Sequence, residues 1–407
     1  MAVSRAIEAK PVTSRKTSAG RTPARERTPT KTTKCDVSVV LPCLNEEESV
    51  GVCVQNAWRW LRETGVTGEV IVVDNGSTDR SAEVALKAGA RVVKELRRGK
   101  GRACLRGFEA ASGRIIVLGD ADATYDFADI GLLTEPLSDG YDLVIGNRLT
   151  DGLGPGAMSW SHRRIGNPLI SLCVRLFAGV RVSDSLSGFR AFTREAYQRM
   201  GLRSEAFEIE CEMILRAAAQ GLRITEVTIP YYARKGDSKL RTFSDGWYIL
   251  RFLLLNTPTY LFMIPGAALV LLGLLSLGIS LGAGGGVTVG TLTWQPVFAG
   301  GILLIVGTNA LMIGMASHMY AASRGIVAEG GLTLLYRQYL TLERVLALAG
   351  LLLLIGVGLD GLIFYQWVSR DDLGLSTAGI AALAQSSIII GANLALGGFL
   401  VALMDIE

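Results

Sequence analysis

Residues 114–122 read RIIVLGDAD, an apolar run of strand length that ends in two acids one residue apart. Four further runs share this character: VSVVLP (37–42), EVIVVD (69–74), ARVVKEL (90–96) and YDLVIGN (141–147). Segments between them, such as residues 46–64, repeat their apolar positions at helical spacing. Strands that alternate with helices predict an α/β domain with a Rossmann-like, mixed but mainly parallel sheet covered on both faces.

Polar residues follow three of these runs. They are Pro42, Asn45 and Glu46 at the first, Asp74 at the second, and Asp120 and Asp122 at the fourth. Ligands of such sheets bind at the carboxyl ends of the strands. Two carboxylates at positions i and i+2 can hold Mg²⁺ or Mn²⁺ while phosphate oxygens complete the shell. One such cluster could be a helix cap or a chance match, but the three together favour a nucleoside diphosphate site with a divalent cation.

The charges of the 407 residues are distributed unevenly. Residues 1–34 hold nine Lys and Arg against two Asp and Glu, residues 35–251 hold 28 of each sign, and residues 252–407 hold four against seven. No charged side chain occurs between Arg251 and Arg324. This gap excludes a wholly water-soluble protein, because a surface that faces water cannot be covered without charge.

The apolar part of the chain predicts four transmembrane helices, at residues 259–283, 296–323, 345–367 and 376–403. The connection 324–344 holds three Arg, whereas residues 284–295 hold no Lys or Arg and residues 368–375 hold one Arg. By the positive-inside rule we expect a multi-pass protein of the plasma membrane, whose catalytic half and C-terminus face the cytoplasm.

Four regions follow from these patterns. Residues 1–34, rich in Ser, Thr and Arg, predict a disordered basic tail. Residues 35–240 form the α/β domain and residues 259–407 the membrane domain. Between them, residues 241–258 mix Trp247 and other aromatic residues with apolar ones, which predicts an amphipathic helix in the headgroup layer.

Cysteine and histidine usage excludes several kinds of site. The six Cys include no C-x-x-C pair and the chain has two His, so a zinc site, a disulfide framework and a Ser-His-Asp nucleophile are all disfavoured. The stretch GKGRACLRGF (99–108) matches neither the P-loop nor the dinucleotide-binding pattern. The sequence therefore disfavours a kinase-like or an NAD-dependent function.

With these motifs the chain resembles the family 2 glycosyltransferases of the GT-A fold, and more narrowly the dolichyl-phosphate or polyprenyl-phosphate sugar synthases. The resemblance covers residues 36–240. It rests on VVLPCLNEEESV, VVDNGSTDRS, KGRACLRGF, LGDADATYDF, VIGNR, VSDSLSGFRAF and ARKGDSKLR. At two positions the chain departs from the pattern: the family often has a second Asp where Asn75 stands, and the mannose branch often has Gln where Thr124 stands. The sugar therefore stays open between glucose, mannose and others.

The resemblance implies roles for individual residues. The nucleotide-sugar pocket would consist of Pro42, Asn45, Glu46, Asp74, Lys100 and Asp120. Asp120 and Asp122 would hold Mg²⁺ or Mn²⁺, with Asp122 as a catalytic residue. The acceptor phosphate would meet Arg148, Ser187, Arg190, Arg234, Ser238 and Lys239. Asp184 is a second catalytic candidate, for orienting the acceptor or the sugar, and its alternative role is to cap a turn.

The implied reaction is an inverting transfer of one hexose, from a donor of the UDP-glucose or GDP-mannose type to a polyprenyl or dolichyl phosphate. A phosphate monoester has a second pKa of about 6, so this acceptor is already ionised near neutral pH and needs no strong base. The site then requires cations for the acceptor and a metal for the leaving nucleoside diphosphate. Expected partners are a nucleotide sugar, a polyprenyl phosphate lipid and the membrane, but no nucleic acid, and a homo-oligomer is left open.

Two other functions are possible. A processive polysaccharide synthase would have Q-x-x-R-W after the site, whereas residues 55–60 here read QNAWRW, in the first helix and in the wrong order. An inactive membrane scaffold is opposed by the intact Asp120, Asp122, Arg148 and Arg190.

Overall fold

The computed structural model describes residues 35–150, 153–154, 156–234, 242–282, 287–289, 292–323, 325–327, 331–369 and 377–405. The predicted basic tail lies outside the described residues, as do Ser238 and Lys239.

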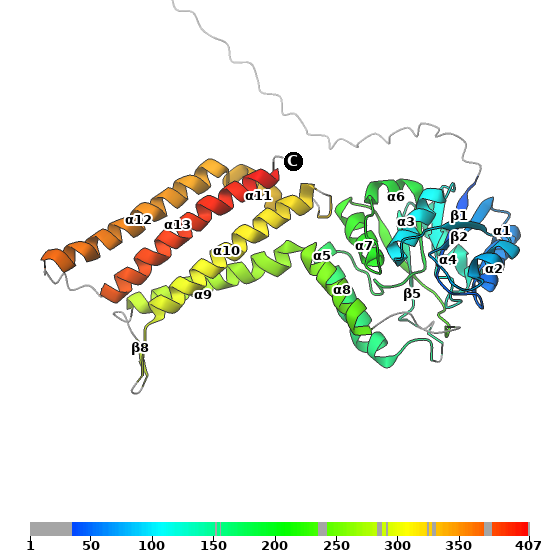
Figure 1. The fold of residues 1–407 in the computed structure, drawn as a ribbon, viewed down its shortest axis with the longest axis horizontal. Coiled ribbons are helices and arrows are strands. Elements are labelled where there is room, and N and C mark those ends of the chain that lie inside the picture. The colour runs from blue at the N-terminus through cyan, green and yellow to red at the C-terminus, as the bar shows by residue number, and fades with distance from the viewer. Residues whose placement is uncertain are drawn as a thin grey trace, which may run out of the picture. The chain divides into compact units, whose positions relative to one another are not determined.

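A seven-stranded sheet forms the centre of the α/β part (Figure 1). Its strands are β1 (Val37–Cys43), β2 (Gly68–Asp74), β3 (Arg91–Lys94), β4 (Ile115–Leu118), β5 (Leu143–Asn147), β6 (Arg190–Thr193) and β7 (Ile224–Thr228). They lie in the order β3-β2-β1-β4-β6-β5-β7, and β6 runs antiparallel to both of its neighbours. All five strands predicted from the apolar runs are confirmed, as is the mixed, mainly parallel sheet.

Helices cover both faces of this sheet. They are α1 (Val50–Thr64), α2 (Ser81–Lys87), α3 (Lys100–Ala110), α4 (Ile130–Ser138), α5 (Asn167–Ala178), α6 (Arg194–Met200) and α7 (Ile209–Ala219). Successive residues of a strand point to opposite faces. In β1, Val39 packs into the core shared with α1 and α4, and Val40 packs into the core shared with α3, α5 and α7.

The strand register brings distant segments to one edge of the sheet. The last residues of β1 and β2 pair with each other, Cys43 with Asp74. Because β6 is antiparallel, its first residue, Arg190, lies beside Leu118 at the end of β4 and Ile145 of β5. The loops after β1, β2, β4 and β5 therefore meet the loop before β6.

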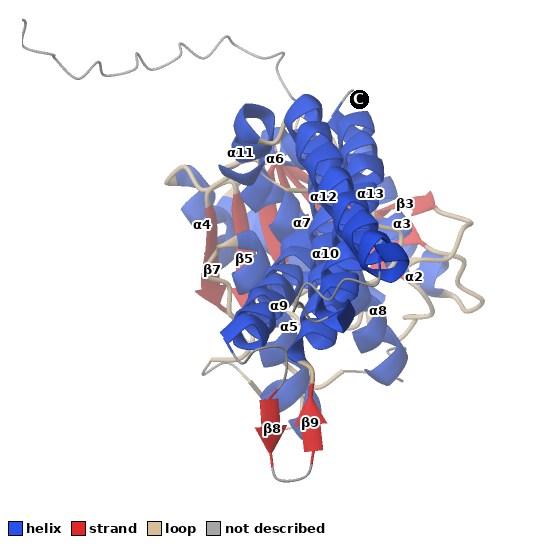
Figure 2. Ribbon diagram, turned by 90° about the vertical axis from the view of Figure 1, so that its left-hand side faces the viewer, coloured by secondary structure: helices blue, strands red, loops and turns tan. Residues whose placement is uncertain are grey.

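The rest of the described chain is mostly helical (Figure 2). It comprises α8 (Thr242–Leu255), the π-helical turn η3 (Thr259–Met263), α9 (Ile264–Gly282), the hairpin β8 (Val287–Val289) and β9 (Leu292–Trp294), α10 (Pro296–Ser323), α11 (Gly331–Tyr339), α12 (Leu342–Ser369) and α13 (Thr377–Asp405). Among the described residues, four helices are long and apolar enough to cross a membrane: Thr259–Ser280, Pro296–Ser323, Leu342–Ser369 and Gly379–Met404. The predicted four spans are confirmed.

Paired glycines bring α9 and α10 into backbone contact. A Cβ added to Gly266 would lie 3.0 Å from the carbonyl oxygen of Gly307, and one added to Gly307 would lie 2.8 Å from that of Gly266. Gly273 and Gly300 are related in the same way, at 3.0 Å in both directions. Small residues at such a seam let membrane helices approach closely, which is how they associate without a hydrophobic driving force.

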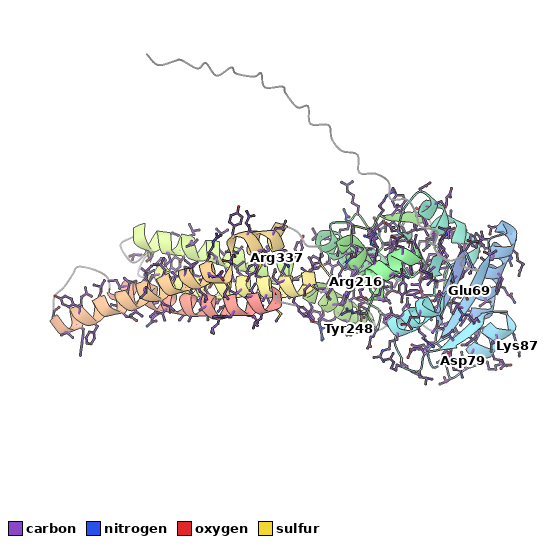
Figure 3. All side chains as sticks on the ribbon, turned by 90° about the horizontal axis from the view of Figure 1, so that it is seen from above. Glu69, Asp79, Lys87, Arg216, Tyr248 and Arg337 are labelled. Atoms are coloured by element: carbon purple, nitrogen blue, oxygen red, sulfur yellow. The ribbon has the colours of Figure 1, made fainter. Side chains whose placement is uncertain are left out.

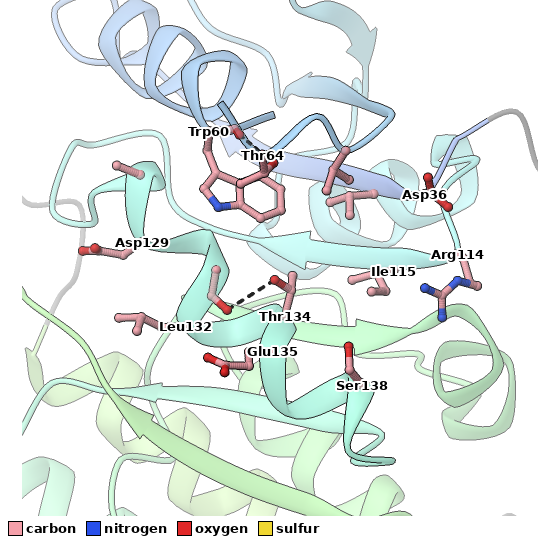
Figure 4. A pocket seen from close by; sticks show the side chains of 14 residues that line it. Asp36, Trp60, Thr64, Arg114, Ile115, Asp129, Leu132, Thr134, Glu135 and Ser138 are labelled. Carbon is pink, nitrogen blue, oxygen red and sulfur yellow. Dashed lines mark hydrogen bonds between the residues drawn. The ribbon is translucent and has the colours of Figure 1, made fainter. Parts of the chain in front are cut away.

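A cavity of about 680 Å³ lies between α1 and α4 (Figure 4). Its lining includes Val37 and Ile115, at the amino ends of β1 and β4, and Trp60 of α1. Because β1 and β4 run parallel, this cavity is at the sheet edge opposite the predicted site.

Candidate active site

Seven of the predicted site residues lie at the carboxyl edge of the sheet, where they form three groups of paired charges together with Glu210. Arg234 contacts Glu46 and Asp122, Lys100 contacts Asp120 and Glu210, and Arg148 contacts Asp184. In each group the partners lie far apart in the sequence.

Asp122 is held by the turn that follows it. Its Oδ1 accepts hydrogen bonds from the backbone N–H of Thr124 at 3.1 Å and from the Thr124 hydroxyl at 2.6 Å. Between them, Ala123 adopts a φ of +59°, the left-handed region that non-glycine residues rarely occupy. Thr124 therefore orients the carboxylate of Asp122. The strained backbone at Ala123 lies directly next to this predicted metal ligand, and such strain is often found at functional sites.

Arg234 lies against the acids expected to bind the nucleotide and the metal. Its Nη1 is 3.2 Å from Asp122 Oδ2, and its Nη2 donates to Glu46 Oε1. The Nε of Arg234 is buried without a hydrogen-bond partner among the described residues. The guanidinium of Arg234 thus neutralises Glu46 and Asp122 in this structure. The sequence had predicted that Arg234 contacts the acceptor phosphate.

Lys100 joins the start of α3 to two other segments. Its Nζ is 2.8 Å from Asp120 Oδ1 and 2.7 Å from Glu210 Oε1. Burial lowers the pKa of the Lys100 ammonium, but the carboxylates of Asp120 and Glu210 outweigh it and hold this pKa well above its usual value. Lys100 therefore stays charged beside Asp120. Sequence reasoning missed Glu210, since an acid in the first turn of a helix is common.

Arg190 corrects one prediction. Its side chain is fully buried and donates to the backbone carbonyls of Ser187 at 2.7 Å, Ser185 at 2.6 Å and Glu210 at 2.6 Å. Burial lowers the pKa of this guanidinium. Each of its three nitrogens donates to a backbone carbonyl and the side chain has no exposed surface, so Arg190 does not face an acceptor phosphate as expected.

Ser187 is also fully buried, and its hydroxyl accepts from the backbone N–H of Phe189 at 3.4 Å. This placement does not support the predicted contact of Ser187 with the acceptor phosphate. Arg190 instead links the loop before β6 to the start of α7, because it donates to the carbonyls of Ser187 and Glu210.

Arg148 and Asp184 form a bidentate ion pair. Arg148 Nε and Nη2 lie 2.7 Å and 2.8 Å from the two oxygens of Asp184, and the Arg148 backbone N–H also donates to this carboxylate. Burial lowers the pKa of Arg148, but Tyr125 and Asp184 together raise it well above its usual value. Asp184 is fully buried, and its contacts in the structure indicate that it positions Arg148.

Asn45 and Asp74 fix the loops after β1 and β2. Asn45, with a φ of +52°, accepts from the backbone N–H of Thr78 at 2.7 Å through Oδ1. Asp74 Oδ1 accepts from the backbone N–H of Ser77 at 2.9 Å. Pro42 is half-buried near the end of β1. Nucleotide contacts of these three residues stay predictions.

Asn75, where the family often has Asp, has a role that requires an amide. Its Nδ2 donates to the carbonyls of Glu95 at 3.1 Å and Arg97 at 2.8 Å, and its Oδ1 accepts from the N–H of Gly99 at 2.8 Å. A carboxylate cannot donate to the two carbonyls. Asn75 thus shapes the loop that leads to Lys100.

The glycines of residues 99–108 serve close packing. A Cβ on Gly99 would lie 2.3 Å from the carbonyl oxygen of Glu205, and one on Gly101 would lie 2.2 Å from that of Ser204. A Cβ on Gly107 would lie 2.3 Å from Val40 of β1. These glycines let α3 approach its neighbours and so place Lys100.

The donor set fits a hard divalent cation. No group of three or more His, Cys, Asp or Glu that could hold a metal occurs among the described residues, so Asp120 and Asp122 would need phosphate oxygens and water to complete a shell. Gly188 makes room for Asp120, because a Cβ there would lie 2.4 Å from Asp120 Oδ2. Carboxylate oxygens are the ligands that Mg²⁺ and Mn²⁺ favour.

The structure combines an α/β sheet that has acids at its carboxyl edge with four apolar helices long enough to cross a membrane, and comparison with known proteins assigns this combination to a family. Residues 38–201 match the model of glycosyl transferase family 2, and residues 315–405 match the glycosyltransferase family 2 C-terminal transmembrane region. A low-salt glycan biosynthesis hexosyltransferase of Haloferax volcanii is 36% identical over 368 residues, which are 89% of this chain and 88% of the relative. The chain belongs to glycosyltransferase family 2 and is a membrane protein.

Two further similarities each cover about half of the chain. A dolichyl-phosphate hexose transferase of Haloferax volcanii is 33% identical over 211 residues, which are 52% of this chain and 89% of the relative. A crystal structure of Mycobacterium tuberculosis glucosyl-3-phosphoglycerate synthase with Mn²⁺, UDP and glucosyl-3-phosphoglycerate is 27% identical, with a TM-score of 0.45, and covers 54% of this chain and 79% of that chain.

Proposed function

We propose that this glycosyltransferase moves one hexose from a nucleotide-diphosphate sugar to a polyprenyl or dolichyl phosphate. The observation that carries the proposal is the arrangement of charge at one sheet edge: the carboxylates of Asp120 and Asp122 with Lys100, Arg148 and Arg234 beside them. The four apolar helices give the chain access to a lipid substrate. The similarity to a dolichyl-phosphate hexose transferase supports the same acceptor class.

The residues present suit this reaction. Asp120 and Asp122 would hold Mg²⁺ or Mn²⁺, which when bound would neutralise charge on the departing nucleoside diphosphate. Arg148, kept cationic by Asp184, is among the described residues one of three cations at this edge, with Lys100 and Arg234, that would orient an anionic group. The acceptor phosphate is itself the nucleophile, so no side chain needs to remove a proton. A single displacement at the anomeric carbon would invert its configuration.

The topology follows the charges of the connections. Three Arg occur in residues 324–344, and the connections on the other side hold one Arg in total. We place the catalytic half and the C-terminus in the cytoplasm on this basis, with the protein in the plasma membrane.

Reconstitution of the purified chain tests the function. Proteoliposomes that contain a short polyprenyl phosphate are supplied with UDP-glucose, GDP-mannose and related donors, with Mg²⁺ or Mn²⁺, and the lipid product is examined by mass spectrometry. We expect one added hexose and loss of transfer in Asp122→Asn. Asp139→Asn, a change at the exposed end of α4, is the matched control and should keep full activity.

Two results would overturn the proposal. A lipid or polymer with many sugars would indicate a processive synthase. Unchanged transfer by Asp122→Asn would show that the carboxyl edge of the sheet is not the active site.

A further inference from the structure

Glu226, in the middle of the edge strand β7, holds a loop that is distant in the sequence. Both oxygens of its carboxylate accept from the backbone N–H of Ser183, each at 2.9 Å, and Oε1 also accepts from the N–H of Asp184 at 2.8 Å. Hydrogen bonds to an ionised acceptor are stronger than those between neutral groups. One side chain therefore fixes two successive residues of the loop before β6.

The sheet register explains how Glu226 reaches this loop. Glu226 of β7 lies beside Ile145 of β5, and Ile145 lies beside Arg190, the first residue of β6. Residues directly opposite each other on neighbouring strands carry their side chains on the same face of the sheet. Ile145 packs into the core that α3, α5 and α7 share, so Glu226 points to that side of the sheet. Val182, next to Ser183, packs into the same core, which places the loop on this side as well.

Asp184 joins this loop to Arg148. Its backbone N–H donates to Glu226, while its carboxylate accepts from Arg148 Nε at 2.7 Å, from Nη2 at 2.8 Å and from the backbone N–H at 3.0 Å. Arg148 directly follows β5, the strand with which β7 pairs. The contacts thus form a closed ring that runs from β7 through the loop and Arg148 to β5 and back to β7. A shift of the loop would move Asp184 and with it the guanidinium.

The other printed contacts of the Arg148 guanidinium are weaker. Its Nη1 is 3.4 Å from the Tyr125 hydroxyl, which is long for a hydrogen bond, and its central carbon is 5.1 Å from the centre of the Tyr231 ring. A bidentate pair between a guanidinium and a carboxylate fixes both the distance and the plane of the guanidinium. The orientation of Arg148 therefore depends mainly on where Asp184 is held.

We propose that Glu226 is a positioning residue of the acceptor site, which sets through Asp184 where the Arg148 guanidinium meets the acceptor phosphate. The inference rests on the proposed function, because it takes Arg148 as a cation that orients the acceptor. Glu226 acts on the loop backbone and not on the substrate. A small misplacement of a group that orients a substrate lowers the rate of reaction, so transfer should respond to a change at position 226 through the acceptor rather than the donor.

Kinetics of the full chain in proteoliposomes test this role with Glu226→Gln. Glutamine keeps the size of the side chain but brings an NH₂ group, which is a donor, against the N–H groups of the loop. Glu69→Gln is the matched control, at a residue labelled in Figure 3. Glu69 likewise accepts from a loop N–H, that of Ser112 at 2.7 Å, but it is the second residue of β2 and so lies at the opposite edge of the sheet.

We expect the KM for a short polyprenyl phosphate to be about tenfold higher in Glu226→Gln, because a charged acceptor is replaced by a neutral one, with the KM for the nucleotide sugar changed by less than about twofold. Glu69→Gln should change neither KM. Arg148→Lys keeps the charge beside Asp184 but cannot make the bidentate contact. In that background Glu226→Gln should change the acceptor KM by less than about twofold, because residues that act through one another are not additive.

Hydrogen exchange of the full chain in detergent gives a readout that needs no activity. The peptide that contains residues 183 and 184 is followed by mass spectrometry, and we expect its amides to exchange faster in Glu226→Gln than in Glu69→Gln or the unmodified chain.

Four results would overturn the proposal. They are unchanged exchange of this peptide, an unchanged acceptor KM, an equal rise of both KM values, and a full effect of Glu226→Gln in the Arg148→Lys background. Absence of transfer by the unmodified chain would instead overturn the proposed function, and the acceptor role of Glu226 with it.

Discussion

Replacing Arg234 with Met should tighten the binding of Mn²⁺ in the absence of nucleotide. In the structure the Arg234 guanidinium lies on Asp122 and Glu46, the side of the acids that a cation would otherwise neutralise. A divalent cation that binds Asp122 must displace this contact. In Arg234→Met no guanidinium competes with the metal ion for Asp122, and the negative charges of Asp122 and Glu46 are no longer neutralised by Arg234.

The magnitude follows from the geometry of the contact. Arg234 Nη1 is 3.2 Å from Asp122 Oδ2, and the Arg234 side chain is 24% exposed, so solvent screens the pair only in part. A hydrogen bond between charged groups contributes about 1.5–3 kcal/mol, and partial exposure favours the lower end. Since about 1.4 kcal/mol corresponds to a tenfold change, the Kd for Mn²⁺ should fall about tenfold.

The assay is a titration of detergent-solubilised protein in which the electron paramagnetic resonance signal of free Mn²⁺ is measured. Arg62→Met, at an exposed position in the last turn of α1, is the control and should bind Mn²⁺ like the unmodified chain. Unchanged or weaker Mn²⁺ binding by Arg234→Met would refute the reasoning. With UDP present, the unmodified chain should bind Mn²⁺ more tightly than Arg234→Met, because the guanidinium that Mn²⁺ displaces is then free to face the diphosphate.

Three substitutions test the supports of the site, each by chemical denaturation of the full chain in detergent. Arg190→Met should cost about 3–5 kcal/mol of unfolding free energy, because three buried carbonyls lose their charged donor. Asn75→Asp should cost about 2–3 kcal/mol, since a carboxylate would face the carbonyls to which the amide donates. Ala123→Gly should stabilise the chain by about 1 kcal/mol, because glycine adopts a φ of +59° without a steric penalty.

The control for Ala123→Gly lies close by in the chain. Ala128→Gly, in the 3₁₀ turn that follows the site, should not stabilise, since it has no positive φ to relieve. Full stability of Arg190→Met, together with weaker acceptor binding, would return Arg190 to the role expected from the sequence. Full stability of Asn75→Asp would mean that the loop before α3 does not depend on the amide.

The sheet and the position of the acids could be predicted because their signals are local. A strand shows itself as an apolar run, and Asp120 and Asp122 directly follow one. The pairing of charges could not be predicted in this way. Lys100 and Glu210 are 110 residues apart, and Arg234 is 188 residues from Glu46, so only the fold reveals these contacts.

Burial accounts for the main difference between expectation and structure. The motif SGFR correctly indicates that Arg190 is near the site, because β6 begins there. A motif does not indicate which way a side chain points, and here the guanidinium points into the protein. Asn75 shows the converse, since a departure from the family pattern proved to be a hydrogen-bond requirement of one loop.

The glycine seam between α9 and α10 limits where a long lipid can travel. Backbones in contact at Gly266 and Gly307, and again at Gly273 and Gly300, leave no space for an isoprenoid chain between these two helices. The same holds for α12 and α13 at Gly356 and Gly391, where an added Cβ would lie 2.8 Å from a carbonyl oxygen of the facing helix. If the proposed function holds, the polyprenyl tail of the acceptor would have to pass along the outside of each helix pair rather than between its two helices.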